Sequence, residues 1–177
     1  MTLFLLGIGN PGDSYIYTRH NLGTLVLKQL IKLYDNNFDG SNNYQFSYKN
    51  YNFIAQWTIS YVNTTGKPMA LFMNKNNIKP SQLMVFFDNL DLDKNQWKYS
   101  YGFGTYGHNG LKSIKVALGS QNYHRIGCGI GRPIHDEVSD YVLGILSPSE
   151  KEQIYFMAYD LYKNNILDKL IENSLSV

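Results

Sequence analysis

Two side chains in this sequence, His20 and Asp88, have the chemistry of a general-base pair. His20 lies in a polar Arg-His-Asn triplet, and Asp88 directly follows the apolar run 83–87. In α/β sheets, catalytic groups collect where buried strands end. A carboxylate can fix the tautomer of an imidazole, whose other ring nitrogen then takes a proton from water. A structural histidine is the alternative, but the neighbours of His20 are polar, so the pair favours hydrolysis by activated water.

Other catalytic arrangements fit the sequence less well. The chain contains no Gly-x-Ser-x-Gly elbow, which argues against a serine hydrolase. The one cysteine, Cys128, lies in an apolar segment, where we expect it to fill the core. The four histidines lack the HxxxH and HxxH spacing of zinc sites, so no zinc site is expected.

The first Gly-rich loop matches a dinucleotide-binding pattern but lacks its context. Residues 7–12 read Gly-Ile-Gly-Asn-Pro-Gly, which fits Gly-x-Gly-x-x-Gly after an apolar segment. No apolar helical period follows until Leu22, and Asp13 would stand beside the pyrophosphate. A nicotinamide-dependent oxidoreductase is therefore disfavoured. A tight strand-to-loop turn is the better interpretation, although it leaves Asn10 and His20 unexplained.

A third candidate segment is Gly-His-Asn-Gly-Leu-Lys at 107–112. Asn109 is expected to cap the helix that follows, with Lys112 and Lys115 near its side of that helix. A helix N-terminus with two lysines can bind phosphate. Two solvated lysines on a surface face are an equally good interpretation.

Strands alternate with helices along the chain. Apolar and alternating runs predict strands at 3–8, 83–87, 96–101 and 123–130, and a hairpin over 44–61 that turns at 49–50. Helical spacing and end signals predict helices over 21–33, 68–77 and 109–118, and one long C-terminal helix from about residue 149. With no repeat or boundary, this order predicts one α/β domain over residues 1–177.

Composition limits the classes of protein that remain. Of the 177 residues, 44% are hydrophobic and 17% charged, which excludes disorder. A net charge of +2 is too small for binding nucleic acid by bulk charge, although a local basic patch remains possible. No apolar run approaches the roughly 18 residues that span a bilayer, and no signal peptide or presequence is recognisable. We therefore expect a cytoplasmic protein without membrane contact, with a mitochondrial one still possible.

Taken together, the motifs resemble the bacterial-type peptidyl-tRNA hydrolase family. The matching segments are Gly-x-Gly-Asn-Pro-Gly at 7–12, Tyr15, Thr-Arg-His-Asn at 18–21, Asp-x-Leu-Asp at 88–91, Gly-His-Asn-Gly-Leu-Lys at 107–112 and Gly-Ile-Gly-Arg-Pro at 129–133. The resemblance implies a single-domain three-layer α/β/α sandwich around a mixed twisted sheet. It implies hydrolysis of the ester between a peptide and the terminal ribose of tRNA, which recycles tRNA from stalled or dropped-off translation. No metal or cofactor is implied, and we expect a monomer.

The resemblance also assigns roles to residues of this chain. His20 is the base, Asp88 orients and polarises it, and Asn10 positions the substrate. Asn63 is preferred to Asn74 because counting back from Asp88 without a gap places the family's Met-Asn pair at 62–63. The full set expected to contact substrate or tRNA is Tyr15, Asn21, Asn63, His108, Asn109, Lys112, Lys98, Arg125 and Arg132.

The chain departs from the family pattern at the expected tRNA end. Two basic residues that clamp the tRNA 5′-phosphate in the family fall on Ser100 and Gly127. We therefore expect normal chemistry with relaxed discrimination at the 5′ end. The alternative is an RNA-binding scaffold of the same descent that does not need the catalytic pair. Retention of Asn10, His20 and Asp88 favours the enzyme.

Overall fold

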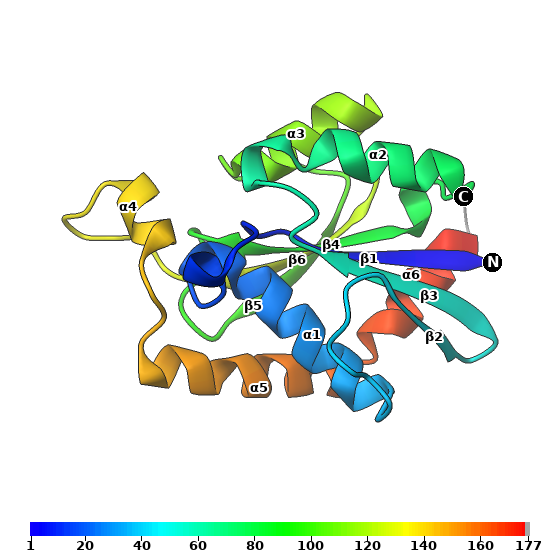
Figure 1. Cartoon of the computed structure of the whole chain (residues 1–177), viewed down its shortest axis with the longest axis horizontal. Helices are drawn as coiled ribbons and strands as arrows, with labels where there is room; N and C mark the ends of the chain where they lie inside the picture. Colours follow the sequence, from blue (N-terminus) through cyan, green and yellow to red (C-terminus); the bar gives the residue numbers. More distant parts are fainter. Residues whose placement is uncertain (176–177) are drawn as a thin grey trace.

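The apolar N-terminal run forms β1 (Thr2–Gly7), which lies inside a six-stranded mixed sheet in the computed structural model (Figure 1). The structure describes residues 1–175. The strand order is β2-β3-β1-β4-β6-β5, in which the four inner strands are parallel and the two edge strands antiparallel. The other strands are β2 (Tyr44–Tyr48), β3 (Tyr51–Trp57), β4 (Leu83–Asn89), β5 (Trp97–Tyr101) and β6 (His124–Gly129).

Helices cover both faces of the sheet, which gives the expected α/β/α layers (Figure 1). One face carries α1 (Leu22–Tyr34), α5 (Pro148–Lys163) and α6 (Ile166–Leu175). The other face carries α2 (Gly66–Lys75) and α3 (Asn109–Leu118). The short helix α4 (Val138–Leu143) stands beyond the ends of the strands.

The two cores follow from the alternation of side chains along each strand. In β1, Leu3 and Leu5 pack with α1 and α5, whereas Phe4 and Leu6 pack toward α2 and α3. Every residue of β4 is buried, as expected for a central parallel strand covered on both faces. The apolar runs of the sequence thus form inner strands, because the apolar side chains on both of their faces must be buried under helices.

The order in which strands are added to the sheet changes direction between β1 and β4. From β1 the chain crosses to β3 on one side, and the next inner strand, β4, pairs with the other side of β1. In open α/β sheets, ligands bind beyond the carboxyl ends of the strands at such a switch point. Asn10 follows β1 and Asp88 lies near the end of β4, so both stand at this crevice.

The start of α1 packs directly on β4. A Cβ atom on Gly23 would lie 2.5 Å from the carbonyl carbon and oxygen of Phe86 and 2.6 Å from the amide nitrogen of Phe87. These neighbours are backbone atoms of a buried strand, so they cannot move aside cheaply. Gly23 therefore sets how close α1, and the short 3-10 helix Arg19–Asn21 before it, approach the end of β4.

Two expectations at the C-terminal end were wrong. The predicted long helix is two helices, because the chain turns at Asn164 and at Asn165, whose φ of 51° is left-handed. The helix α4 was not predicted from the sequence, because it has only six residues and one buried side chain. The expected hairpin is confirmed, and its turn residues Lys49 and Asn50 have positive φ.

Among residues 1–175, no helix combines the length and apolar character needed to cross a membrane.

We expect Gly23→Ala to lower the free energy of unfolding by up to about 2 kcal/mol, because overpacking against β4 costs about 1–3 kcal/mol and Ala regains ~1 kcal/mol over Gly in a helix. Urea unfolding of the two proteins measures this difference. Gln29→Ala, on the same helix, is the control and should change stability little. A stabilised Gly23→Ala protein would show that α1 can move away from β4 at no cost.

Candidate active site

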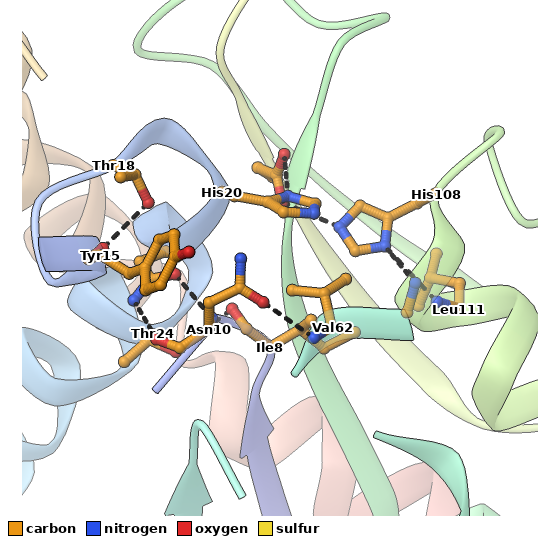
Figure 2. Close-up of polar contacts among 12 residues, drawn as sticks. Ile8, Asn10, Tyr15, Thr18, His20, Thr24, Val62, His108 and Leu111 are labelled. Carbon is orange, nitrogen blue, oxygen red and sulfur yellow. Dashed lines mark hydrogen bonds and ion pairs between the residues drawn. The ribbon is translucent and has the colours of Figure 1, made fainter. Parts of the chain in front are cut away.

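The site is built around one buried carboxylate, Asp88, which contacts two imidazoles. Nδ1 of His20 lies 2.9 Å from Oδ1 and 3.0 Å from Oδ2 of Asp88. Nε2 of His108 lies 2.8 Å from Oδ1. The Asp88 side chain is only 1% exposed, and the two histidine rings lie 5.0 Å apart between centroids (Figure 2). The structure therefore brings together the predicted base and its predicted partner, and adds His108 as a second partner of Asp88.

The helix that follows fixes the tautomer of His108. Nδ1 of His108 accepts hydrogen bonds from the backbone N–H groups of Gly110 and Leu111, at 3.1 and 3.4 Å. Nε2 must then carry the ring proton and donate a hydrogen bond to Asp88. His108, and not Asn109, is thus the N-cap of α3, so the expected cap was wrong. Because His108 takes the capping role, the exposed Asn109 is left facing the pockets.

The Asp88 carboxylate sets the direction in which the pKa of His20 is shifted. Burial by itself would lower the pKa of His20, but the charge of Asp88 and its hydrogen bond outweigh burial and raise the pKa above 6.5. Burial would raise the pKa of Asp88, but the adjacent His108 and His20 hold it well below its usual value. Asp88 is therefore ionised, and the Nδ1–H group of His20 donates to it.

Ligand atoms of His20, Asp88 and His108 lie within 4.8 Å of one another, close enough to consider a metal ion. Both ring nitrogens of His108 are already committed, one to Asp88 and one to α3. Binding an ion through Nε2 would shift the proton to Nδ1, where it would face two N–H donors. The donor set therefore fits a hydrogen-bonded catalytic group better than a metal site.

Asn10 is held by three hydrogen bonds that the sequence does not reveal. Its Oδ1 accepts from the backbone N–H of Val62 at 3.0 Å, which orients its amide nitrogen toward His20 (Figure 2). Its backbone is braced by Asn21, whose side chain accepts from N–H of Asn10 at 2.8 Å and donates to its carbonyl at 3.0 Å. Asn21 was expected to line the cleft, but it is 2% exposed and braces the Asn10 loop instead.

Three hollows meet at these residues. A pocket of about 570 Å³ is lined by Asn10, His20, Asn63 and Asn109, with α4 residues Ser139, Val142 and Leu143 as its far wall. A cavity of about 330 Å³ lies on the side of Asp88, His108 and α4, and a groove of about 680 Å³ runs between α2 and α3. The contribution of α4 to the pocket could be found only from the fold, because the sequence of α4 contains no recognisable functional motif.

The preference for Asn63 over Asn74 agrees with these positions. Asn63 lines both the pocket with His20 and the α2–α3 groove. Asn74 lines only the groove, and its neighbour Met73 is buried in the core of that face. Tyr15 is half-buried and its ring contacts Tyr61, which lines the pocket, so it supports the pocket from outside.

The four basic residues that were predicted to contact substrate or tRNA lie in different environments. Lys112 lines the α2–α3 groove, and Arg132 lines the cavity near α4 while paired with Asp91. Lys98 is exposed on the edge strand β5. Arg125 is fully buried, and its guanidinium donates to the carbonyls of Phe103, Gly104 and Gln121. The prediction that Arg125 contacts phosphate was therefore wrong, because its guanidinium is buried and holds a loop.

A further ion pair, which was not predicted from the sequence, anchors α4 and the segment around His20. Arg19 donates to Glu150 through Nε and Nη2, at 3.1 and 3.2 Å, and to the carbonyl of Tyr141. Its guanidinium also lies 4.4 Å from the centre of the Tyr141 ring. The sequence did point to Arg19 as a residue of interest, since it stands beside His20 in the 18–21 motif.

We expect the His20 ring to titrate in NMR spectra with a midpoint above 6.5. In Asp88→Asn the midpoint should fall below 6.5, because burial remains while the attraction that raised the pKa is removed. The linked stability from His20 is fully present below pH 6.5 and is lost as pH rises through the raised pKa. An unchanged midpoint in the variant would show that Asp88 does not control His20.

Comparison with known proteins gives a consistent result. A family model described as peptidyl-tRNA hydrolase matches residues 4–175. Peptidyl-tRNA hydrolases from Rickettsia canadensis and Rickettsia akari are 36% and 37% identical, each aligned over 98% of this chain and 95% of the relative. A crystal structure of a variant peptidyl-tRNA hydrolase from Acinetobacter baumannii superposes with a TM-score of 0.76 at 27% identity, over 98% of this chain and 94% of that one.

Proposed function

The chain belongs to the peptidyl-tRNA hydrolase family, and on that premise we propose how its residues hydrolyse the ester that joins a peptide to tRNA. The observation that carries the proposal is the His20–Asp88 pair. Nδ1 of His20 is bound to Asp88, and Nε2 has no hydrogen-bond partner within residues 1–175. Since His20 lines the pocket, Nε2 is available to a water molecule there.

In this mechanism His20 acts first as base and then as acid. Nε2 takes a proton from water, and the water oxygen adds to the ester carbonyl carbon. The tetrahedral intermediate then collapses, breaking the bond between that carbon and the ribose oxygen, which receives the proton from His20. The products are a peptide carboxylic acid and a tRNA with a free terminal hydroxyl. Asp88 stays ionised and stabilises the imidazolium formed in between.

The amide of Asn10 is suited to the charge that develops on the carbonyl oxygen. Its own oxygen is occupied by the Val62 N–H, so its NH₂ group is the part left to donate. A donor fixed before the reaction stabilises a developing oxyanion without reorganisation. Asn10 therefore both places the ester and supports its transition state.

The hollows around His20 suit the two arms of the substrate. The α2–α3 groove carries Lys67 and Lys112, which suit the phosphates of the tRNA end. The cavity beside α4 carries Leu90, Val138 and Val142, which suit peptide side chains. The two arms of the substrate are joined at the ester. The α2–α3 groove, the cavity beside α4 and the central pocket likewise meet at Asn109, which lines all three.

Amide side chains at this junction give a preference for peptidyl over aminoacyl substrate. Asn63 and Asn109 line the pocket and can pair with a peptide group. An aminoacyl-tRNA has an ammonium group and no peptide bond, so these amides would lose their partners. Both amides are exposed in the free protein, but bound substrate would cover them. Each polar group that is covered without a partner costs about 1–3 kcal/mol, so two can give a large preference.

We expect His20→Ala to slow release of an N-acetyl-amino acid from its tRNA by about 10²–10⁴-fold, because general-base catalysis contributes that much. Binding of deacylated tRNA should stay unchanged, and it is measured beside the release rate. His135→Ala is the control, since His135 is exposed and lines none of the three hollows.

The same experiment decides the alternative of an RNA-binding scaffold. If the unmodified protein bound tRNA but released no product, the catalytic pair would be unused and the scaffold would be the correct function. If the protein released product and His20→Ala released it equally fast, another base would be required.

The surroundings of Ser100 and Gly127 support relaxed recognition of the tRNA 5′ end. A Cβ atom on Gly127 would lie 2.9 Å from Nδ2 of Asn89, so a longer side chain there would need rearrangement. Lys98 is opposite Gly127 in the sheet, and Arg125, opposite Ser100, points into the protein. Lys98 is therefore the remaining basic candidate on this pair of strands.

We expect kcat/KM to differ by less than about fivefold between peptidyl-tRNA with and without its 5′-phosphate, because one exposed charge contact contributes about 0.2–1 kcal/mol. Parallel assays of the two substrates measure the ratio, and Lys98→Ala should bring it close to one. A phosphate dependence much stronger than tenfold would contradict relaxed recognition.

A further inference from the structure

The helices α1 and α5 lie on the face of the sheet that contains neither α2 nor α3 (Figure 1). A separate groove is lined by residues of both helices. Its volume is about 600 Å³, and it shares no lining residue with the three hollows of the active site. Its apolar lining comes from Leu25 on α1, Ile154 on α5 and Phe38 in the loop after α1. The hydrolysis proposed above uses none of these residues.

Three lysines, Lys28, Lys32 and Lys151, line this groove without acidic partners. Among the described residues, none of these lysines has a carboxylate oxygen within 4 Å of its ammonium nitrogen. Burial and the nearby Lys32 both lower the pKa of Lys28, as expected where like charges share a surface. Three unneutralised cations along one groove favour an anionic ligand with several charges.

Exposed aromatic rings lie beside these charges. Tyr17 and Tyr155 line the groove and are about half exposed. Tyr159 continues the row one turn along α5, its ring 6.0 Å from that of Tyr155 at an interplanar angle of 16°. The ammonium of Lys151 lies 4.5 Å from the centre of the Tyr17 ring, so cation and ring form one surface.

We propose that this α1–α5 groove binds single-stranded RNA. A positive groove that follows the phosphates, with aromatic side chains on which bases stack, is how proteins bind single strands without sequence preference. The lysines supply the first element, and Tyr17, Tyr155 and Tyr159 supply the second. An acidic peptide would satisfy the charges but would gain less from a row of ring faces. The site therefore gives the protein an RNA contact that is independent of the tRNA acceptor end.

The test is fluorescence anisotropy of a labelled twelve-residue oligouridylate with the full-length protein. The variant Lys28→Gln/Lys32→Gln/Lys151→Gln should bind at least about tenfold more weakly, and the slope of log K against log salt should fall by about 2, at about 0.7 per phosphate. Tyr155→Ala should weaken binding by about tenfold without changing that slope.

The control variant, Lys75→Gln/Lys79→Gln/Lys163→Gln, removes the same charge from exposed lysines outside the groove. It should retain the affinity and slope of the unmodified protein. Equal losses in the two triple variants, no oligouridylate binding by the unmodified protein, or equally tight binding of a polyglutamate peptide at the groove would each overturn the proposal. Release of N-acetyl-amino acid from tRNA, unchanged in the groove variant, shows that the variant is folded and separates this result from the hydrolase mechanism.

Discussion

A buried negative charge at Asp88 is the constraint on which the site depends. A carboxylate that is almost fully enclosed needs hydrogen-bond donors on all sides, and here two imidazoles supply them. The carboxylate and its two donors come from three different elements: Asp88 lies near the end of the central strand β4, His20 lies in the turn before α1, and His108 caps α3. The charge therefore ties three elements together at one point, and it leaves one ring nitrogen of His20 unused.

The irregular segments around this point are fixed by side chains bonded to backbone. Asn21 holds the backbone of Asn10, and Asn10 holds the N–H of Val62. Arg19 joins the same turn to Glu150 and to Tyr141. Loops carry no ladder of their own hydrogen bonds, so such contacts give a loop the fixed geometry that catalysis requires.

The low net charge of +2 hides an uneven distribution. Several basic residues are neutralised or buried inside the protein, such as Arg19 with Glu150 and Arg125 among backbone carbonyls. The lysines of the α2–α3 groove and of the α1–α5 groove have no acidic partner within the described residues. The protein thus presents positive charge locally on both helical layers while its total charge remains small.

The sequence by itself determined the α/β class and nearly all strands and helices, because these follow from local periodicity, which acts within a few residues along the chain. The pairing of His20 with Asp88 joins residues far apart in the chain, and it was expected from their residue types and from the resemblance of the motifs to a known family. Only the tertiary structure decided that His108 caps α3 and shares Asp88, that Asn21 and Arg125 face inward, and that α4 closes the pocket. These depend on partners far away in sequence, since a polar side chain's role is set by which donors and acceptors folding places within about 3 Å of it.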